Sequence, residues 1–339
     1  MTKIISIGII GTGFGKVIAQ NFKAVDPSIK IYFSGRSKEK LETVANEVSA
    51  DGVYSTWQEL ILDPKIDFVV IASYSGAHKE MFEFAAKAGK NILVEKPAAL
   101  LSSEIDEMIK SVTDKSTIIA VNHEGRFHPV ISYLKGLIES GKLGSIMTLR
   151  IGAYLNWYSN PEYVENWGNN KDLGGGQIFS VGTHQIDLAR YLLNNPLINS
   201  GSVQGISFPN PKFSKDATGD SQFVAYFKTD SNTSIQLYND CYCFGYKDFT
   251  IEIIGSNGIV LYSDQRGLKT NFSNSAPMDS IEWHDPMPEI TLGNSLVSKS
   301  MKYMAKALIE SIKTGKSNHI FCSLQDEKEN LKLFEKYEK

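Results

Sequence analysis

The chain has 339 residues, of which 42% are hydrophobic and 22% charged, and its formal net charge is -3 at pH 7. This composition is typical of a globular protein, and the length suffices for two domains. The charge offers no basic footprint for nucleic acid, and no apolar run approaches membrane-spanning length. The three cysteines (Cys241, Cys243 and Cys322) fit neither a disulfide framework nor a zinc-ligand pattern. With no leader visible before the first strand, we expect a cytoplasmic protein without a metal site.

Residues 3–15, KIISIGIIGTGFG, are an apolar, β-branched run that leads into three glycines. The pattern predicts a buried parallel strand, a tight turn and a helix over about residues 14–24. Glycines let the backbone approach a pyrophosphate, and the free N–H groups of a helix N-terminus attract its charge. The usual third glycine would fall at Lys16, one position after Gly15. The alternative is a tight turn in some other α/β fold. The candidate cofactor-binding residues here are Gly11, Thr12, Gly13, Phe14 and Gly15.

A second strand is predicted at residues 30–34, and Ser37 is suited to cap a helix that runs to about residue 49. The end of this strand decides the type of cofactor in a dinucleotide fold, since an acidic residue binds a ribose 2′-hydroxyl and an arginine accommodates a 2′-phosphate. No acid stands there. Arg36, with Ser37 and Lys38, therefore favours NADP(H), with NAD(H) as the alternative. Arg36 and Lys38 could also be solvated charges at a helix start.

Further strands are predicted at residues 53–55, 67–72, 91–94 and 117–121. Helices are predicted between them: one begins at a Thr56–Glu59 capping box, and two more cover residues 79–88 and 103–113. Six strands that alternate with helices indicate a doubly wound parallel sheet. We therefore expect residues 1–121 to form a dinucleotide-binding Rossmann domain.

Polar side chains cluster after three of these strands. Ser73 and His78 follow the fourth strand, Glu95 and Lys96 the fifth, and His123 and Arg126 the sixth. Ligands of doubly wound sheets bind at the carboxyl ends of the strands. Ser73, His78, Glu95 and Lys96 are accordingly further candidates for cofactor binding.

The alternation ends after Asn122. Helices are predicted at residues 129–140 and 177–193, and strands at 145–158, 222–229, 233–240, 248–254 and 258–262. Residues 263–291 look irregular, and helices at 295–313 and 324–337 close the chain. Consecutive strands without helices predict an antiparallel sheet. We expect residues 122–339 to form a substrate and oligomerisation domain, whose final helices can pack back on the first domain.

Several motifs occur together in one order: GIIGTGFG at 8–15, EKP at 95–97, GRFHP at 125–129, GKLG at 141–144 and GGG…GTHQID at 174–187. In these motifs the chain resembles the Gfo/Idh/MocA oxidoreductases over essentially its whole length. The resemblance implies a Rossmann domain followed by an α/β domain with a large, open, mostly antiparallel sheet. It implies hydride transfer between a nicotinamide cofactor and a carbinol carbon of a sugar, cyclitol or related polyol. It also implies a homodimer or homotetramer formed through that sheet.

Two residues match the catalytic residues of that family. Lys96 matches its lysine, whose ammonium would stabilise developing alkoxide charge and relay the hydroxyl proton. His184 matches its histidine, which would face Lys96 and act as acid/base or as a hydrogen-bond partner of the substrate. Glu95 would contact the cofactor ribose or nicotinamide. The plainer alternatives are a lysine that reaches solvent and a structural histidine.

One departure concerns the position four residues before His184, where inositol-dehydrogenase-like members carry an aspartate and this chain has Ser180. Either His184 works with Lys96 alone, or Asp187 helps to orient it, or turnover is weak. The remaining candidates for a substrate wall, each of which could equally be ordinary packing, are His123, Arg126, Tyr154, Trp157, Tyr158 and Trp167.

Two other functions remain open. The same fold hosts enzymes that act on non-sugar diols or carbonyl compounds. It also hosts cofactor-binding regulators without turnover, a reading that Ser180 favours weakly and that Lys96 together with His184 opposes.

Overall fold

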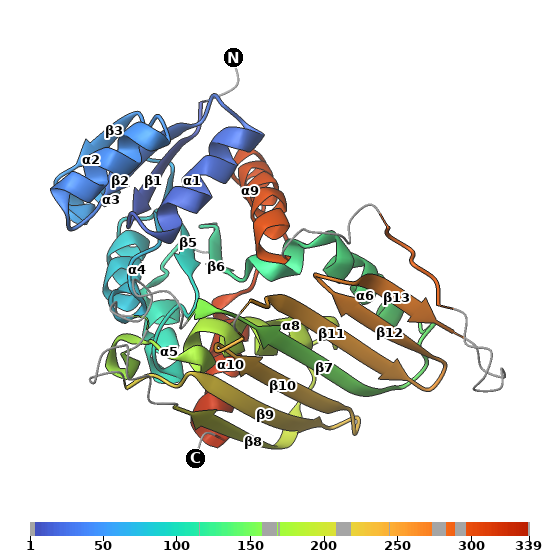
Figure 1. Cartoon of the computed structure of the whole chain (residues 1–339). Helices are drawn as coiled ribbons and strands as arrows, with labels where there is room; N and C mark the ends of the chain where they lie inside the picture. Colours follow the sequence, from blue (N-terminus) through green and yellow to red (C-terminus); the bar gives the residue numbers. More distant parts are fainter. Residues whose placement is uncertain are drawn as a thin grey trace. The chain divides into compact units, whose positions relative to one another are not determined.

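The computed structural model describes residues 4–114, 116–157, 168, 170–207, 218–243, 245–272, 283–288 and 296–337. Its contacts divide the chain into two units. The first comprises Met1–Glu124 and Met301–Lys332, and the second comprises Gly125–Ser300 and Leu333–Lys339. Each unit contains one sheet (Figure 1). The first unit therefore includes a segment from the end of the chain as well as its beginning.

The sheet of the first unit has six parallel strands in the order β3-β2-β1-β4-β5-β6, which is the strand order of a doubly wound dinucleotide-binding fold. This confirms the predicted parallel sheet. The strands are β1 (Ser6–Ile10), β2 (Lys30–Ser34), β3 (Gly52–Tyr54), β4 (Phe68–Ile71), β5 (Asn91–Glu95) and β6 (Ile119–Asn122). The helices that alternate with them are α1 (Phe14–Val25), α2 (Lys38–Glu47), α3 (Trp57–Leu62), α4 (His78–Lys87) and α5 (Ser102–Ser111).

Helices cover both faces of this sheet, as two neighbouring residues of β1 show. A Cβ at Gly8 would lie 2.4 Å from Leu60 of α3, whereas Ile9 approaches Gly15 of α1. Successive residues of a strand point to opposite faces. α1 and α3 therefore lie on opposite faces, and the strands between them are buried and apolar.

Local capping sets the starts of two helices as the sequence predicts. The Ser37 hydroxyl accepts the N–H of Lys40 at the start of α2. Thr56 and Glu59 form the predicted capping box of α3. Within the described ranges, no helix is long and apolar enough to cross a membrane.

The sheet of the second unit has seven strands in the order β13-β12-β11-β7-β10-β9-β8. All neighbours pair antiparallel except β7 and β10, which are parallel, so the predicted sheet is confirmed as mostly antiparallel. The expectation of irregular structure after residue 262 is wrong at β13, which pairs with β12. β8 was also not among the predicted strands. The strands are β7 (Ile146–Tyr154), β8 (Ile198–Ile206), β9 (Gln222–Thr229), β10 (Ser234–Asp240), β11 (Asp248–Gly255), β12 (Gly258–Ser263) and β13 (Gly267–Asn271).

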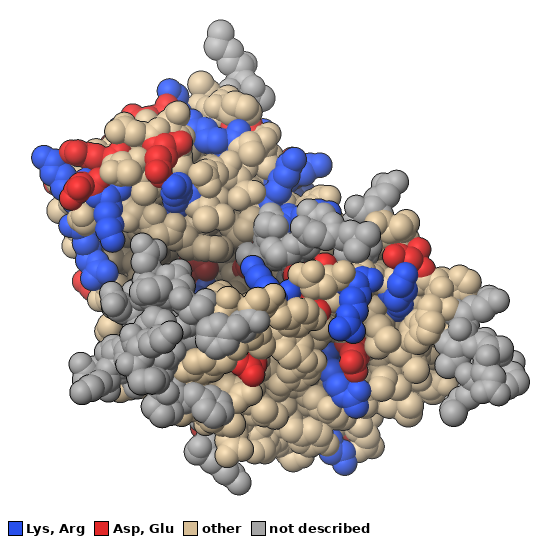
Figure 2. Space-filling view, in the orientation of Figure 1, with Lys and Arg blue, Asp and Glu red and all other residues tan. Residues whose placement is uncertain are grey.

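Helices α6 (Pro129–Glu139) and α8 (Thr183–Leu192) cover one face of this sheet, and no helix of the described residues covers the other, which is called the open face below (Figure 1). Leu149 and Ile151 of β7 join Ile186 of α8 in the core. On the open face, Arg150 donates hydrogen bonds to Gln236 and Glu252 at 2.8 Å each. That face is largely uncharged in Figure 2, with scattered charges of both signs. The last two helices of the chain are α9 (Leu296–Thr314) and α10 (Leu324–Tyr337).

The helix predicted at residues 177–193 is a π-helical turn, Ile178–Gly182, followed by α8. The start of this helical segment is fixed by Asp220, which lies just before β9. One carboxylate oxygen of Asp220 accepts the N–H groups of Gln177 at 2.8 Å and Ile178 at 2.9 Å. A Cβ at Gly176, where φ is 95°, would lie 2.5 Å from Asp220. Asp220 thus caps the helix that carries His184.

We expect Asp220→Ala to lower the free energy of unfolding by about 2 kcal/mol, because two buried amide groups lose a charged acceptor. Urea titration measures this effect. Asp230→Ala is the matched control. Asp230 is exposed and follows β9, the strand that Asp220 precedes. Equal stability of the two variants would contradict the capping role.

Candidate active site

The glycine turn lies at the end of β1, where the strand order of the first sheet reverses. Gly11 has a φ of 111°, and a Cβ there would lie 2.2 Å from the carbonyl oxygen of Ala72. Its N–H is held by the carbonyl of Ser34 at 2.9 Å. By contrast, a Cβ at Gly13 would meet nothing within 4 Å. Gly11 is thus needed for the turn, and Gly13 leaves open space beside the backbone.

Gly15 allows the close helix–strand packing that the third glycine of the dinucleotide-binding motif usually allows. A Cβ there would lie 2.8 Å from Ile9, so the absence of a side chain lets α1 pack closely on β1. Lys16 instead pairs with Glu47. The first turn of α1 contains no acidic residue, while Gly13 and Phe14 are exposed and Thr12 is partly exposed. This turn fits the pyrophosphate of a dinucleotide.

Arg36 is exposed directly after β2, and its guanidinium carbon lies 5.0 Å from the centre of the Tyr74 ring. This geometry is a cation–π contact between the ends of β2 and β4. The neighbouring Ser37 uses its hydroxyl as the cap of α2, and Lys38 is exposed. The structure thus brings Arg36 to the predicted strand end and gives Ser37 a structural contact as well.

His78 is buried and binds two loops to each other. Its Nδ1 lies 2.8 Å from the carbonyl oxygen of Pro97, and its Nε2 lies 3.1 Å from that of Ser73. Burial lowers the pKa of His78, although both carbonyls favour the protonated ring. The predicted cofactor contact of His78 is therefore not supported by exposure, because only 1% of the residue is accessible. Ser73 remains partly exposed.

Glu95 is the last residue of β5 and Lys96 follows it, and several charged groups lie close to both. Glu95 is buried and accepts a hydrogen bond from the side-chain amide of Asn122. Burial and the nearby Glu124 raise the pKa of Glu95 to about 8. Lys96 is partly exposed, and burial lowers its pKa against the opposing effect of Glu124, Glu95 and Glu327. A lowered pKa makes the neutral amine of a lysine more accessible, which favours a role in proton transfer.

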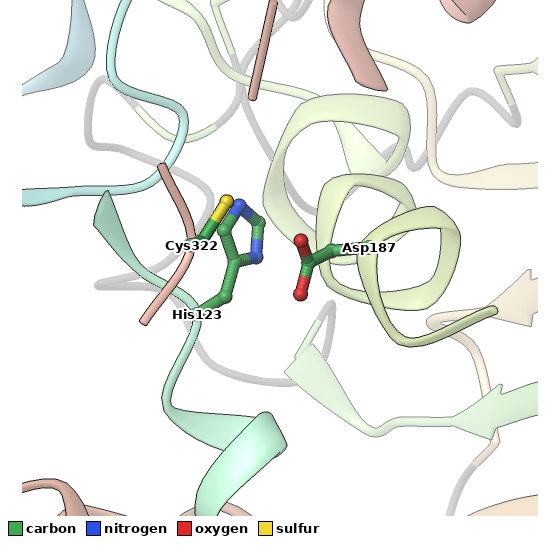
Figure 3. Close-up of side chains that lie close together, drawn as sticks. All are labelled: His123, Asp187 and Cys322. Carbon is green, nitrogen blue, oxygen red and sulfur yellow. The ribbon is translucent and has the colours of Figure 1, made fainter. Parts of the chain in front are cut away.

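The ring of His123 contacts a carboxylate inside the first unit. It is buried at the end of β6, and its Nε2 donates to a carboxylate oxygen of Glu327 at 2.8 Å. Cys322 lies beside it, with its sulfur and a ring nitrogen of His123 within 4.8 Å of each other (Figure 3). The structure thus gives His123 a buried partner within the first unit, and the substrate role predicted for it stays a prediction. Glu327 was not predicted, because nothing in the local pattern separates it from the other acids of α10.

Arg126 and Asp187 of the second unit are both buried and bind each other. Nε and a terminal nitrogen of Arg126 donate to the two oxygens of Asp187, at 2.8 Å and 2.6 Å. The guanidinium also lies over the ring of Tyr191, 4.9 Å from its centre. The pair fastens α8 to the segment before α6. The structure therefore supports the structural interpretation of Asp187 and gives Arg126 a partner other than a substrate.

His184 is the one residue between positions 181 and 190 that is not buried. Ser180 and Trp157 are partly exposed too, and Trp157 packs against the core of this unit. Tyr154 is not brought together with His184. It lies on the open face of the sheet, its ring centre 5.7 Å from those of Tyr238 and Tyr246, whereas α8 covers the opposite face. Tyr158 and Trp167 lie outside the described residues.

Two family models match the chain. One, described as an oxidoreductase family with an NAD-binding Rossmann fold, matches residues 5–123, and the other, the GFO/IDH/MocA C-terminal domain, matches residues 131–261. The chain belongs to the Gfo/Idh/MocA oxidoreductase family. The resemblance seen in the motifs is thereby confirmed, and so is the nicotinamide-dependent oxidoreductase class.

Curated relatives in this family include levoglucosan dehydrogenase of Pseudarthrobacter phenanthrenivorans, which is 26% identical over 85% of each chain. Myo-inositol 2-dehydrogenase of Thermotoga maritima is 27% identical over 77% of this chain and 75% of its own. A solved levoglucosan dehydrogenase in complex with NADH and levoglucosan has a TM-score of 0.86 and 23% identity, covering 99% of this chain and 96% of its own. That structural likeness shows a shared fold.

Lys96 belongs to the first unit and His184 to the second. The family resemblance implies that His184 faces Lys96, and this arrangement stays a prediction.

We expect Glu95→Gln to become more stable relative to wild type as pH rises from about 5 to about 8. The folded protein holds the Glu95 proton more tightly than the unfolded chain, with a pKa of about 8 against 4.5. Stability from this group is therefore present below the lower value and is lost as pH rises through the higher one. The relative gain is on the order of a few kcal/mol. Denaturant titrations across this pH range measure it.

Glu80→Gln, an exposed carboxylate on α4, is the control and should show no such trend. A difference between Glu95→Gln and wild type that stays constant across the range would contradict the raised pKa.

Proposed function

We propose that this enzyme transfers hydride between a nicotinamide cofactor and a carbinol carbon of a sugar, cyclitol or related polyol. The observation that carries the proposal is the place of Lys96. It is a partly exposed lysine with a lowered pKa, at the carboxyl end of β5 in a sheet with dinucleotide-binding order. The names of relatives, levoglucosan dehydrogenase and myo-inositol 2-dehydrogenase, support the substrate class.

The nicotinamide, when bound, supplies the hydride chemistry. The chain supplies binding, position and proton transfer. The turn around Gly13 and the first turn of α1 would hold the pyrophosphate. The amine of Lys96 would take the hydroxyl proton in oxidation and return it in reduction. As an ammonium, it would also stabilise negative charge on the reacting oxygen.

His184 is proposed as the second polar group at the substrate, acting as acid/base or as a hydrogen-bond partner. Its exposure within an otherwise buried stretch of α8 supports this role. Both carboxylate oxygens of Asp187 already accept from Arg126. We therefore favour His184 working with Lys96 rather than relying on Asp187. Ser180 and Trp157 remain candidates for the substrate wall.

A second candidate substrate class is a non-sugar diol. Trans-1,2-dihydrobenzene-1,2-diol dehydrogenase of Xenopus tropicalis is 26% identical over 60% of this chain and 59% of its own. Turnover over a panel of sugars, inositols and diols separates the two classes. Tight cofactor binding without turnover on any of them would favour a regulator.

We expect Lys96→Ala to lower kcat/KM by about 10²–10⁴-fold, the usual contribution of a general acid–base group. Binding of NADPH, followed by fluorescence, should change little, because the glycine turn is untouched. Lys87→Ala, at the exposed end of α4, is the control. Full activity of Lys96→Ala would overturn the assignment.

We propose NADP(H) as the preferred cofactor, with NAD(H) as the alternative. Arg36, exposed after β2 and placed against Tyr74, would bind a 2′-phosphate. The relatives solved with NADH show that the fold also accepts the other cofactor.

Arg36→Ala should weaken kcat/KM for NADP by about 10–100-fold, as expected for the loss of a charge-assisted hydrogen bond. The value for NAD should stay within a few-fold. Lys40→Ala, an exposed cation in the first turn of the following helix α2, is the matched control. A wild-type preference for NAD would refute this role of Arg36 and leave that of Lys96 standing.

We also propose a homodimer or homotetramer formed through the open face of the seven-stranded sheet. Val224 and Tyr226 of β9 are exposed on that face, at 52% and 44%. A cytoplasmic location is proposed as well, and three cysteines without a disulfide support it.

A further inference from the structure

The peptide group that joins Pro97 to Ala98 is held at both of its polar ends. Its carbonyl oxygen lies 2.8 Å from Nδ1 of His78, and its N–H donates to a carboxylate oxygen of Glu327 at 3.1 Å. All of these groups are buried within the first unit. Only Pro97 separates this peptide group from Lys96, and the proline ring fixes φ there, so holding the plane of the peptide group restricts the path of the chain that leaves the lysine.

Glu327 is itself held firmly. Its second oxygen accepts from His123 at 2.8 Å and from the side-chain amide of Asn330 at 3.4 Å. It is fully buried in the first turn of α10, where the helix N-terminus favours a negative charge. The segment before this helix is bound to β6, since the N–H of Val121 donates to the carbonyl of Cys322 at 2.9 Å.

We propose that Glu327 is a positioning residue for Lys96, which it orients by holding the Pro97–Ala98 peptide group from α10. Close polar contacts thus link Ser73, His78, the peptide group, Glu327 and His123, with the His78 ring between the carbonyl oxygens of Ser73 and Pro97. They join the loops after β4, β5 and β6 to the C-terminal helix. The proposal rests on the proposed function in that it takes Lys96 as the proton-transfer group.

Glu327 also acts on Lys96 by its charge. Among the described residues of the first unit, the charged and titratable groups that act on Lys96 include Glu95 of β5, Glu124 after β6, Glu327 of α10 and His78 of α4. The carboxylates favour the ammonium form of Lys96 and oppose the effect of burial on its pKa. Loss of the charge at Glu327 should therefore make the Lys96 amine titrate at lower pH.

Glu327→Gln is the decisive variant, because its amide oxygen can still accept from the N–H of Ala98 while the side chain carries no charge. Glu329→Gln is the matched control. It makes the same change two residues away on the same helix, where Glu329 contacts Gln325 and Lys332 on the surface. Circular dichroism and thermal melting report whether each variant folds.

The first measurement needs no turnover. Acetylation of Lys96 by acetic anhydride is followed over pH by mass spectrometry of the peptide that contains it, with the purified full chain. Reaction requires the neutral amine, so the midpoint for Glu327→Gln should move down by about one pH unit, the effect of one nearby charge. Wild type and Glu329→Gln should coincide. An unchanged midpoint in Glu327→Gln would overturn the proposal.

The second measurement uses turnover of the polyol that the wild type accepts. We expect Glu327→Ala to lower kcat at least about 10-fold with KM nearly unchanged, because a misplaced acid–base group costs mainly kcat. Glu327→Gln should recover most of kcat, with its pH profile displaced to lower pH. Full kcat in Glu327→Ala would overturn the positioning role. If the wild type turns over no substrate, the proposed function fails, yet the acetylation result still decides the inference about Glu327.

Discussion

The burial of charge at one edge of the parallel sheet is the constraint on which the first unit depends. Burying an ionised group without a partner costs several kcal/mol, so each such group must be paired or neutralised. Here Glu95 accepts a hydrogen bond from Asn122, and its raised pKa favours the neutral form. Glu327 accepts hydrogen bonds from His123 and from a backbone amide. These contacts hold together the ends of β5 and β6 and the first turn of α10. Lys96 directly follows β5 at this place.

In the second unit, helix α8 both covers the sheet and carries His184. α8 must cover a face of the seven-stranded sheet, and it does so with apolar residues such as Ile186 and with Gln185, whose amide donates to the carbonyls of Ile151 and Tyr238. The same helix leaves His184 partly exposed. A helix packed on the sheet in this way holds the backbone of His184 in place, which suits a group that must meet a substrate.

Prediction from sequence worked best where the signal is local. The bounds of β2 and β9 agree with expectation, and the caps at Ser37 and Thr56 were identified from their spacing. It failed where pairing rather than propensity makes the element. β13 is a short strand that exists because it pairs with β12, and the parallel pairing of β10 with β7 joins strands that are far apart in the chain.

The sequence by itself determined the order of elements, the glycine turn and the position of Lys96 at a strand end, since these depend on periodicity and backbone preference within a few residues. The tertiary structure decided which buried charges meet. It paired Arg126 with Asp187, placed Tyr154 on the open face of its sheet, and brought Glu327 to the amide of Ala98 across 229 positions of the chain. Such partners are selected by the desolvation of charge inside a packed fold, and no local pattern records that selection.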